Sequence, residues 1–166
     1  EQTAARLPGI STFGNRWAAA TVGDLDGDQD PDLILGASPP LIQLNDGHGY
    51  FANGGTLPLD SMVLGQSLAL GDSDGDGDAD VLFGNRETSS SLFLNDGAAR
   101  FTDATALRFA TPPPRVRARA SWIDVDGDGD LDALFDSDAL FVNDGRGWFV
   151  DRSAELPPAP PGLPHA

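Results

Sequence analysis

Cysteine and lysine are absent from this chain of 166 residues, and histidine occurs only at His48 and His165. Without cysteine, the chain has no disulfide, no thiolate ligand for zinc and no cysteine nucleophile. Neither histidine lies in a recognisable catalytic pattern, and no glycine-rich phosphate loop follows a predicted strand. We therefore predict that the protein is not an enzyme. One alternative is retained, a fragment of a polysaccharide-active enzyme that uses paired carboxylates.

Long apolar runs are also missing, because the longest are only a few residues, too short for a membrane span or a retained signal peptide. An apolar share of 40% can still bury a sizeable core, so we expect one globular unit without membrane insertion. The first residue is Glu1 rather than Met, which indicates a processed chain or a fragment. Arginine without lysine, beside abundant Ala, Gly and Pro, points to a bacterial source, and the absence of cysteine is compatible with export.

Positive charge is scarce, since ten basic residues stand against 26 acidic ones and the formal net charge is −16. The acidity is local. Three nonapeptides at 24–32, 72–80 and 124–132 hold 15 of the acidic residues, and the other 11 nearly balance the ten arginines. This distribution argues against nucleic acid as a partner, because phosphate binding needs a basic face.

Each nonapeptide carries Asp at every second position, and the copies begin 48 and then 52 residues apart. A hard divalent cation prefers six to eight oxygen ligands, and a short turn can bring several Asp side chains to one point. Calcium suits this donor set; magnesium is the alternative, although it demands a tighter octahedron and keeps much of its water. Zinc lacks nitrogen and sulfur ligands here. We predict about three calcium ions, one in each nonapeptide, and call these nonapeptides the Asp loops.

Two rival interpretations of the Asp loops conflict with the residues that follow them. Three apolar residues follow each loop directly, which a solvated acidic linker would lack. An EF-hand loop needs a bidentate Glu at its twelfth position, where this chain has Leu35, Phe83 and Phe135. The segments after the loops are short and rich in aliphatic and aromatic residues, which is typical of strands.

A second shared marker, Asn-Asp-Gly, follows each loop at 45–47, 95–97 and 143–145 and predicts a tight hairpin turn. Four residues beyond each turn glycine comes a Phe that we assign to the core, and two residues before each loop comes an apolar residue that we assign to contacts between repeats. These residues are Phe51, Phe101 and Phe149, and Val22, Leu70 and Trp122, respectively. Each repeat thus predicts four short strands, the pattern of a β-propeller blade.

The succession of Asp loop, apolar strand, Asn-Asp-Gly and Phe resembles the FG-GAP or VCBS repeats of integrin-α-like calcium-binding β-propellers, over residues 16–153. The resemblance implies an all-β fold of three four-stranded antiparallel blades at about 16–55, 64–104 and 116–153. A lead-in or edge segment at 1–15 and a Pro-rich tail at 154–166 flank them. It also implies that positions one, three, five and nine of each loop bind calcium through side chains, and position seven through its main-chain oxygen. The predicted metal-site residues are Asp24, Asp26, Asp28, Asp30, Asp32, Asp72, Asp74, Asp76, Asp78, Asp80, Asp124, Asp126, Asp128, Asp130 and Asp132.

Three blades are too few for a ring, because known propellers close with about four or more. Two apolar faces would be left open, so we expect the incomplete ring to be closed by association. A second copy would give a six-bladed homodimer; another protein partner or further blades are the alternatives. Calcium loading fits a secreted protein, extracellular or periplasmic. The expected function is protein binding or assembly with structural calcium, and a lectin-like, glycan-binding propeller is the alternative.

Three arginines, Arg115, Arg117 and Arg119, alternate before the third loop and so share one face of a strand. They either neutralise nearby Asp loops or form a stripe that binds an anion or a partner. Trp148, Tyr50 and Arg100 share the position before the core Phe. The aromatic pair is either ordinary surface packing or a stacking site for a sugar or a protein.

Two departures from the repeat pattern carry expectations of their own. Gln29 stands where the other loops have Gly77 and Gly129, at a backbone position that favours positive φ, so a lower calcium affinity is expected there. Asp136 stands where the first two repeats have glycine, so that strand end is expected to bend differently.

Overall fold

The computed structural model describes Leu7 and residues 19–59, 65–85, 89–114, 119–136 and 138–157. Within these residues the chain forms three four-stranded sheets, each built from consecutive strands, which we call blades 1, 2 and 3. The strands are β1 (Ala20–Gly23), β2 (Asp32–Leu35), β3 (Leu41–Asn45) and β4 (Phe51–Thr56) in blade 1; β5 (Gly65–Gly71), β6 (Asp80–Asn85), β7 (Ser91–Asn95) and β8 (Phe101–Asp103) in blade 2; and β9 (Ala120–Ile123), β10 (Asp132–Phe135), β11 (Ala139–Asn143) and β12 (Phe149–Asp151) in blade 3. Neighbouring strands pair antiparallel, so the predicted all-β fold of three propeller-like blades is confirmed.

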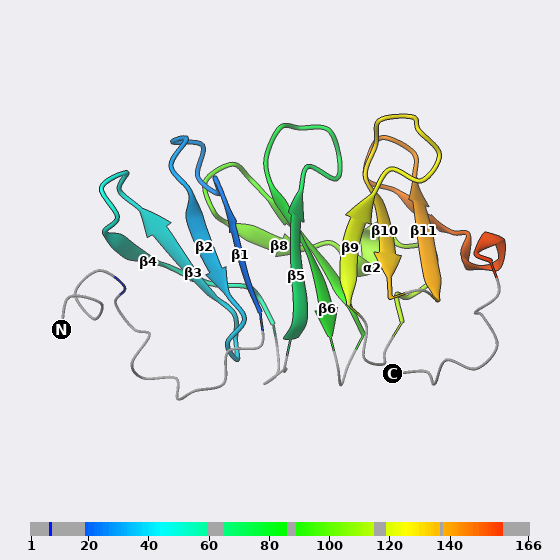
Figure 1. The fold of residues 1–166 in the computed structure, drawn as a ribbon, viewed down its shortest axis with the longest axis horizontal. Coiled ribbons are helices and arrows are strands. Elements are labelled where there is room, and N and C mark those ends of the chain that lie inside the picture. The colour runs from blue at the N-terminus through cyan, green and yellow to red at the C-terminus, as the bar shows by residue number, and fades with distance from the viewer. Residues whose placement is uncertain are drawn as a thin grey trace.

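The two sequence markers form two of the three hairpin connections of each blade. Each Asp loop joins the first strand to the second; in blade 1, for example, Gly23 pairs with Asp32 across the loop. Each Asn-Asp-Gly turn joins the third strand to the fourth, and in blade 2 the Asp96 N–H donates to the Arg100 carbonyl at 3.2 Å. The three Asp loops lie at the same end of the blades, as Figure 1 shows.

Two clusters of buried apolar side chains fill the junctions between the blades. The first joins blades 1 and 2 and contains Leu25, Ile34, Ile42, Leu57, Val81, Phe83, Phe93 and Ala99. The second joins blades 2 and 3 and contains Leu82, Leu92, Phe109, Ala120, Ala133, Phe135, Phe141 and Phe149. Side chains alternate along a strand, so β6 contributes to both clusters and is buried throughout. We call the face of a blade that points toward the preceding blade its leading face, and the opposite face its trailing face.

At the two junctions between described blades, the end of the inner strand packs so closely on the next blade that the residue there is glycine. The inner strands β1, β5 and β9 lie side by side (Figure 1). A Cβ on Gly23 would lie 2.8 Å from Leu70 Cδ1, and a Cβ on Gly71 would lie 2.9 Å from Trp122 Cδ1. Leu70 and Trp122 are therefore confirmed as contacts between repeats. The same prediction for Val22 is wrong, since that side chain is 59% exposed and no blade precedes blade 1 among the described residues.

The three Phe residues that we assigned to the core differ in burial. Phe149 is 1% exposed and belongs to the second cluster, which confirms the prediction. Phe101 is half-buried and packs against the first cluster. Phe51 is half-buried and belongs to neither cluster, so the prediction is wrong there.

Blade 2 is followed by a short helix that the strand pattern does not predict. Helix α2 (Thr105–Arg108) leads the chain from blade 2 to blade 3, and a 3-10 turn, η2 (Ser153–Glu155), follows blade 3. After α2, Phe109 stacks on Phe149 with ring centroids 4.7 Å apart. In the part of the chain that the structure describes, no helix is long and apolar enough to cross a membrane.

The backbone part of both expectations is confirmed, and the lower calcium affinity expected for the first Asp loop stays a prediction. Gln29 has φ of 72°, close to the 95° and 96° of its glycine equivalents, Gly77 and Gly129. Asp136 has φ of 51°, in the left-handed region that favours glycine, whereas its equivalents Gly36 and Gly84 have no positive φ. The backbone at the end of β10 therefore differs from that of the other two blades.

Candidate metal centres

The first Asp of each loop folds the loop around its own carboxylate. Asp72 Oδ1 accepts a hydrogen bond from the Gly75 N–H at 2.8 Å, and Asp72 Oδ2 accepts one from the Gly77 N–H at 3.0 Å. The other loops repeat this pair of bonds, from Gly27 and Gln29 to Asp24 and from Gly127 and Gly129 to Asp124. The alternation of Asp and small or flexible residues thus produces a turn with satisfied backbone donors.

The ninth Asp of each loop is fully buried and connects the loop to the next turn. Asp80 accepts hydrogen bonds from the Ser73 N–H at 3.0 Å, the Ser73 hydroxyl at 2.5 Å and the Asn95 N–H at 2.9 Å. The equivalent backbone donors are Leu25 and Asn45 for Asp32, and Val125 and Asn143 for Asp132. One carboxylate therefore holds the second loop residue and the Asn of the Asn-Asp-Gly turn together.

Three of the predicted ligands converge in every loop. The first, third and ninth Asp each offer a carboxylate oxygen, and these oxygens lie within 4.8 Å of one another. The groups are Asp24, Asp26 and Asp32; Asp72, Asp74 and Asp80; and Asp124, Asp126 and Asp132.

The fifth and seventh Asp residues lie outside these groups. In the second loop, Asp76 Oδ1 accepts a hydrogen bond from the Asp78 N–H at 2.9 Å. A Cβ on Gly97 would lie 2.6 Å from Asp78 Oδ2, so the Asn-Asp-Gly turn needs glycine for this close approach as well as for its φ of 74°. The first, third and ninth Asp converge, but the ligand roles of all five positions stay predictions.

Two buried oxygen atoms indicate that the carboxylate groups of the first and second loops fit a cation. Asp26 Oδ1 and Asp74 Oδ1 are buried and have no hydrogen-bond partner among the described residues. A buried polar atom without a partner is costly, and a cation placed among the converging carboxylates would satisfy it. Every donor in each group is a carboxylate oxygen, which suits a hard divalent cation rather than one that prefers nitrogen or sulfur. The residues present could therefore hold three such ions, one per blade.

Burial and mutual repulsion make the ionised carboxylates unfavourable without a counter-charge. Burial raises the pKa of Asp80 to about 6, against the opposing effect of its hydrogen bonds from Ser73 and Asn95. Burial, with a smaller effect of the neighbouring carboxylates, also raises the pKa values of Asp26 and Asp126. A bound cation would reverse this balance, because its charge favours the ionised form.

A pH dependence follows for the metal-free protein. In the folded state Asp80 has a pKa of about 6, above its ordinary value of 3.8, so the folded state holds an additional proton between these values. The contribution of Asp80 to the folding stability should be greatest below about pH 4 and should be lost as the pH rises through about 6. We expect the melting temperature in chelator to decrease over this window in the wild type, and Asp80→Asn to reduce the decrease. Asp103→Asn, which changes an exposed carboxylate outside the Asp loops, is the control, and an Asp80→Asn profile identical to the wild type would contradict the assignment.

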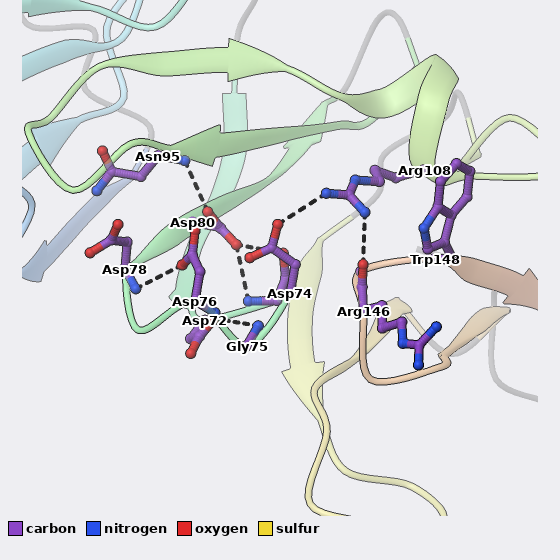
Figure 2. Close-up of polar contacts among 12 residues, drawn as sticks. Asp72, Asp74, Gly75, Asp76, Asp78, Asp80, Asn95, Arg108, Arg146 and Trp148 are labelled. Carbon is purple, nitrogen blue, oxygen red and sulfur yellow. Dashed lines mark hydrogen bonds and ion pairs between the residues drawn. The ribbon is translucent and has the colours of Figure 1, made fainter.

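Arg108 joins the carboxylate group of the second Asp loop to blade 3. Its Nη2 forms an ion pair with Asp74 Oδ2 at 3.0 Å, and its Nη1 donates to the Arg146 carbonyl at 2.7 Å. The guanidinium carbon also lies 5.4 Å from the centroid of the Trp148 ring. Figure 2 shows the guanidinium between Asp74 and the Arg146 backbone, with Trp148 alongside. One Asp74 oxygen is thus paired with Arg108, while the other, Oδ1, stays available for a cation.

The other residues singled out in the sequence have mixed outcomes. Arg115 and Arg117 lie outside the described residues. Arg119 is exposed and its carbonyl accepts the Asp136 N–H at 2.8 Å; within the described ranges its side chain forms no ion pair with an Asp loop. Tyr50 and Trp148 are 52% and 46% exposed. No sequence pattern indicates Arg108, because its partner Asp74 is 34 residues away.

Comparison with known proteins supports the repeat and the fold. Residues 72–135, from the second Asp loop to the end of β10, match the family of FG-GAP-like repeats. A comparison with curated proteins found no match. Among solved structures, the chain is similar to a lectin from Agrocybe aegerita, described as specifically recognising non-reducing terminal N-acetylglucosamine, with a TM-score of 0.53 and 24% identity. The match covers 79% of this chain and 36% of the lectin chain, so this chain spans about a third of that protein.

Proposed function

We propose that this chain, with its FG-GAP-like repeat at residues 72–135, is a secreted, calcium-stabilised β-propeller segment that acts as a protein-binding or assembly module. The observation that carries the proposal is the common construction of the three Asp loops, each with three carboxylate oxygens within 4.8 Å of one another. Calcium is the proposed ion because it accepts many oxygen ligands in flexible geometry. Extracellular calcium is millimolar, so the proposed location is extracellular or periplasmic.

The proposed role of calcium is structural, and we assign the chain no catalytic role. Each ninth Asp is buried and already holds the loop and the Asn-Asp-Gly turn, so an ion at this carboxylate would fix the connections among three strands of a blade. An ion held largely by side-chain carboxylates has few coordination positions left for a substrate, which favours structure over Lewis-acid chemistry.

Calorimetric titration tests the proposal directly. We expect chelator-treated protein to bind about three calcium ions per chain. Asp26→Asn removes one converging carboxylate and should abolish or weaken binding at one site only. Asp103→Asn is the matched control, because Asp103 is an exposed carboxylate outside the Asp loops and should leave all sites intact. Absence of saturable calcium binding would overturn the proposal.

Glycan binding is the second candidate function, and one observation favours it. Trp148 is an exposed aromatic residue, and its ring lies beside the Arg108 guanidinium. An aromatic ring exposed at a surface can stack on a sugar, and the fold is similar to that of a lectin. Glycan binding that is lost in Trp148→Ala and kept in Tyr50→Ala would favour this candidate.

A further inference from the structure

Both internal junctions are made by the same hydrogen bond. The Asn95 side-chain amide of blade 2 donates to the Leu25 carbonyl in the loop of blade 1 at 2.9 Å. The Asn143 amide of blade 3 donates to the Ser73 carbonyl in the loop of blade 2 at 2.8 Å. Leu25 and Ser73 are the second residues of their Asp loops, and both are 1% exposed. Each blade therefore offers an Asn amide on its leading side and a loop carbonyl on its trailing side.

Among the described residues, the donor at one end of the array and the acceptor at the other end have no partner in a neighbouring blade. Asn45 in blade 1 donates to the Pro31 carbonyl of its own blade at 3.2 Å. Asn143 makes the equivalent bond, to Leu131, and the bond to the neighbouring blade as well. At the other end, the second residue of the third loop is Val125, whose side chain is 46% exposed. Among the described residues, no donor reaches the Val125 carbonyl.

Side-chain size at the inner strands is complementary between the two ends as well. At each internal junction a glycine faces a large residue, Gly23 against Leu70 and Gly71 against Trp122. The equivalent position at the end of β9 is Ile123, which is 38% exposed, and the equivalent position in β1 is Val22, which is 59% exposed. A junction between these two ends would pair Ile123, which is larger than glycine, with Val22, which is smaller than Leu70 and Trp122, so that the smaller partner offsets the larger residue.

The third metal cluster is less enclosed than the other two. Asp126 is exposed, whereas its equivalents Asp26 and Asp74 are half-buried, each with one fully buried oxygen. In the internal junctions, the turn of the next blade covers the loop; a Cβ on Gly147, for example, would lie 2.8 Å from Asp74 Cβ. The equivalent turn residue of blade 1, Gly49, is at the free end of the array. Within the described part of the chain, the third cluster therefore has no following blade to cover it.

We propose that blade 3 of one copy docks on blade 1 of a second copy, with the Asn45 amide donating to the Val125 carbonyl and the turn of blade 1 enclosing the third cluster. The inference rests on the proposed assembly function and names its partner. A second copy fits because the donor and the acceptor are both on this chain, so two copies satisfy both ends through two equivalent junctions. Like faces do not fit, because two leading sides offer donors only.

Mass measurement by light scattering with charge variants tests this proposal. In calcium, the wild type is expected at about twice the chain mass of 17.3 kDa. Val22→Glu on the leading face and Val125→Glu on the trailing face should each raise the dimer dissociation constant by on the order of 100-fold or more, because each buries an unpaired charge. Leu107→Glu is the matched control, since Leu107 is 63% exposed on α2, and it should remain dimeric. Ile123→Glu is a second trailing-face variant should Val125→Glu not fold.

Mixing the two monomeric variants tests the head-to-tail arrangement. A mixture of Val22→Glu and Val125→Glu has one junction with both substitutions and one junction without any, so it should form a heterodimer. Dimers formed by two leading faces or by two trailing faces would instead persist in the variant whose substitution lies on the other face. Asp126→Asn should weaken the dimer more than Asp26→Asn, because only the third cluster is completed by the second copy.

Several results would overturn the inference. A wild-type monomer, a larger or open-ended assembly, or a mixture that stays monomeric would each exclude the proposed ring. A monomer that still binds calcium and melts at a higher temperature in calcium would refute this junction while leaving structural calcium intact. A dimer whose dissociation constant and melting temperature are unaffected by calcium would refute the structural role of calcium and the link to the third cluster.

Discussion

Removal of calcium is expected to lower the melting temperature of this protein by on the order of 20 °C. A ligand at 100 times its dissociation constant stabilises the folded state by about 2.7 kcal/mol per site, and the structure offers three clusters. For a domain of this length, 1 kcal/mol corresponds to a shift of about 2–4 °C. The metal-free clusters also carry repelling, partly buried carboxylates, so the ion relieves a cost as well as adding bonds. Melting in EDTA and in millimolar calcium measures the difference.

Controls separate calcium from general salt effects. Calcium added back in excess should restore the midpoint, whereas magnesium at the same concentration should restore less of it, because magnesium gives up its water reluctantly. Dilute protein should be used, so that dissociation of any dimer does not add to the shift. An unchanged midpoint in EDTA would refute the structural role of calcium.

The local motifs were predictable because their structure depends on residues close in sequence. The carboxylate of Asp72 bonds to backbone N–H groups three and five residues ahead, so the nonapeptide specifies its own turn. The Asn-Asp-Gly turns and the apolar strands after each loop also follow from local chemistry. Because the markers occur three times, the same local prediction applies to three segments. The order of the markers then predicts the four-stranded blades.

Features that depend on a neighbouring blade were harder to predict. Val22, Leu70 and Trp122 occupy equivalent positions, yet only Val22 is exposed, because burial depends on which blade comes before. Arg108 reaches an Asp of the second loop across 34 residues, which no local pattern indicates. The same reasoning explains why the third cluster, although identical in spacing, is more exposed than the others.

Replacement of Phe109, a residue that the sequence analysis did not single out, is expected to have the second large effect, a loss of folding stability. Phe109→Ala is expected to destabilise the folded protein by about 3–5 kcal/mol, the usual cost of removing a buried aromatic ring. Phe109 is 5% exposed; its ring stacks on Phe149 and meets Phe141 edge-on with centroids 5.1 Å apart. These contacts join the segment after α2 to blade 3, so their loss should open the second junction. Thermal melting in saturating calcium measures the effect.

Comparison with and without calcium shows whether this junction is independent of the ions. The Phe109 ring contacts aromatic side chains and none of the converging carboxylates, so Phe109→Ala should lower the midpoint by a similar amount in calcium and in EDTA. The neighbouring Leu107→Ala is the control, because that side chain is 63% exposed and its removal should change stability by less than about 0.5 kcal/mol. A loss confined to the calcium-bound protein would mean that the apolar junction forms only after the ions bind. The cluster of apolar side chains between blades 2 and 3 would then depend on calcium for its assembly.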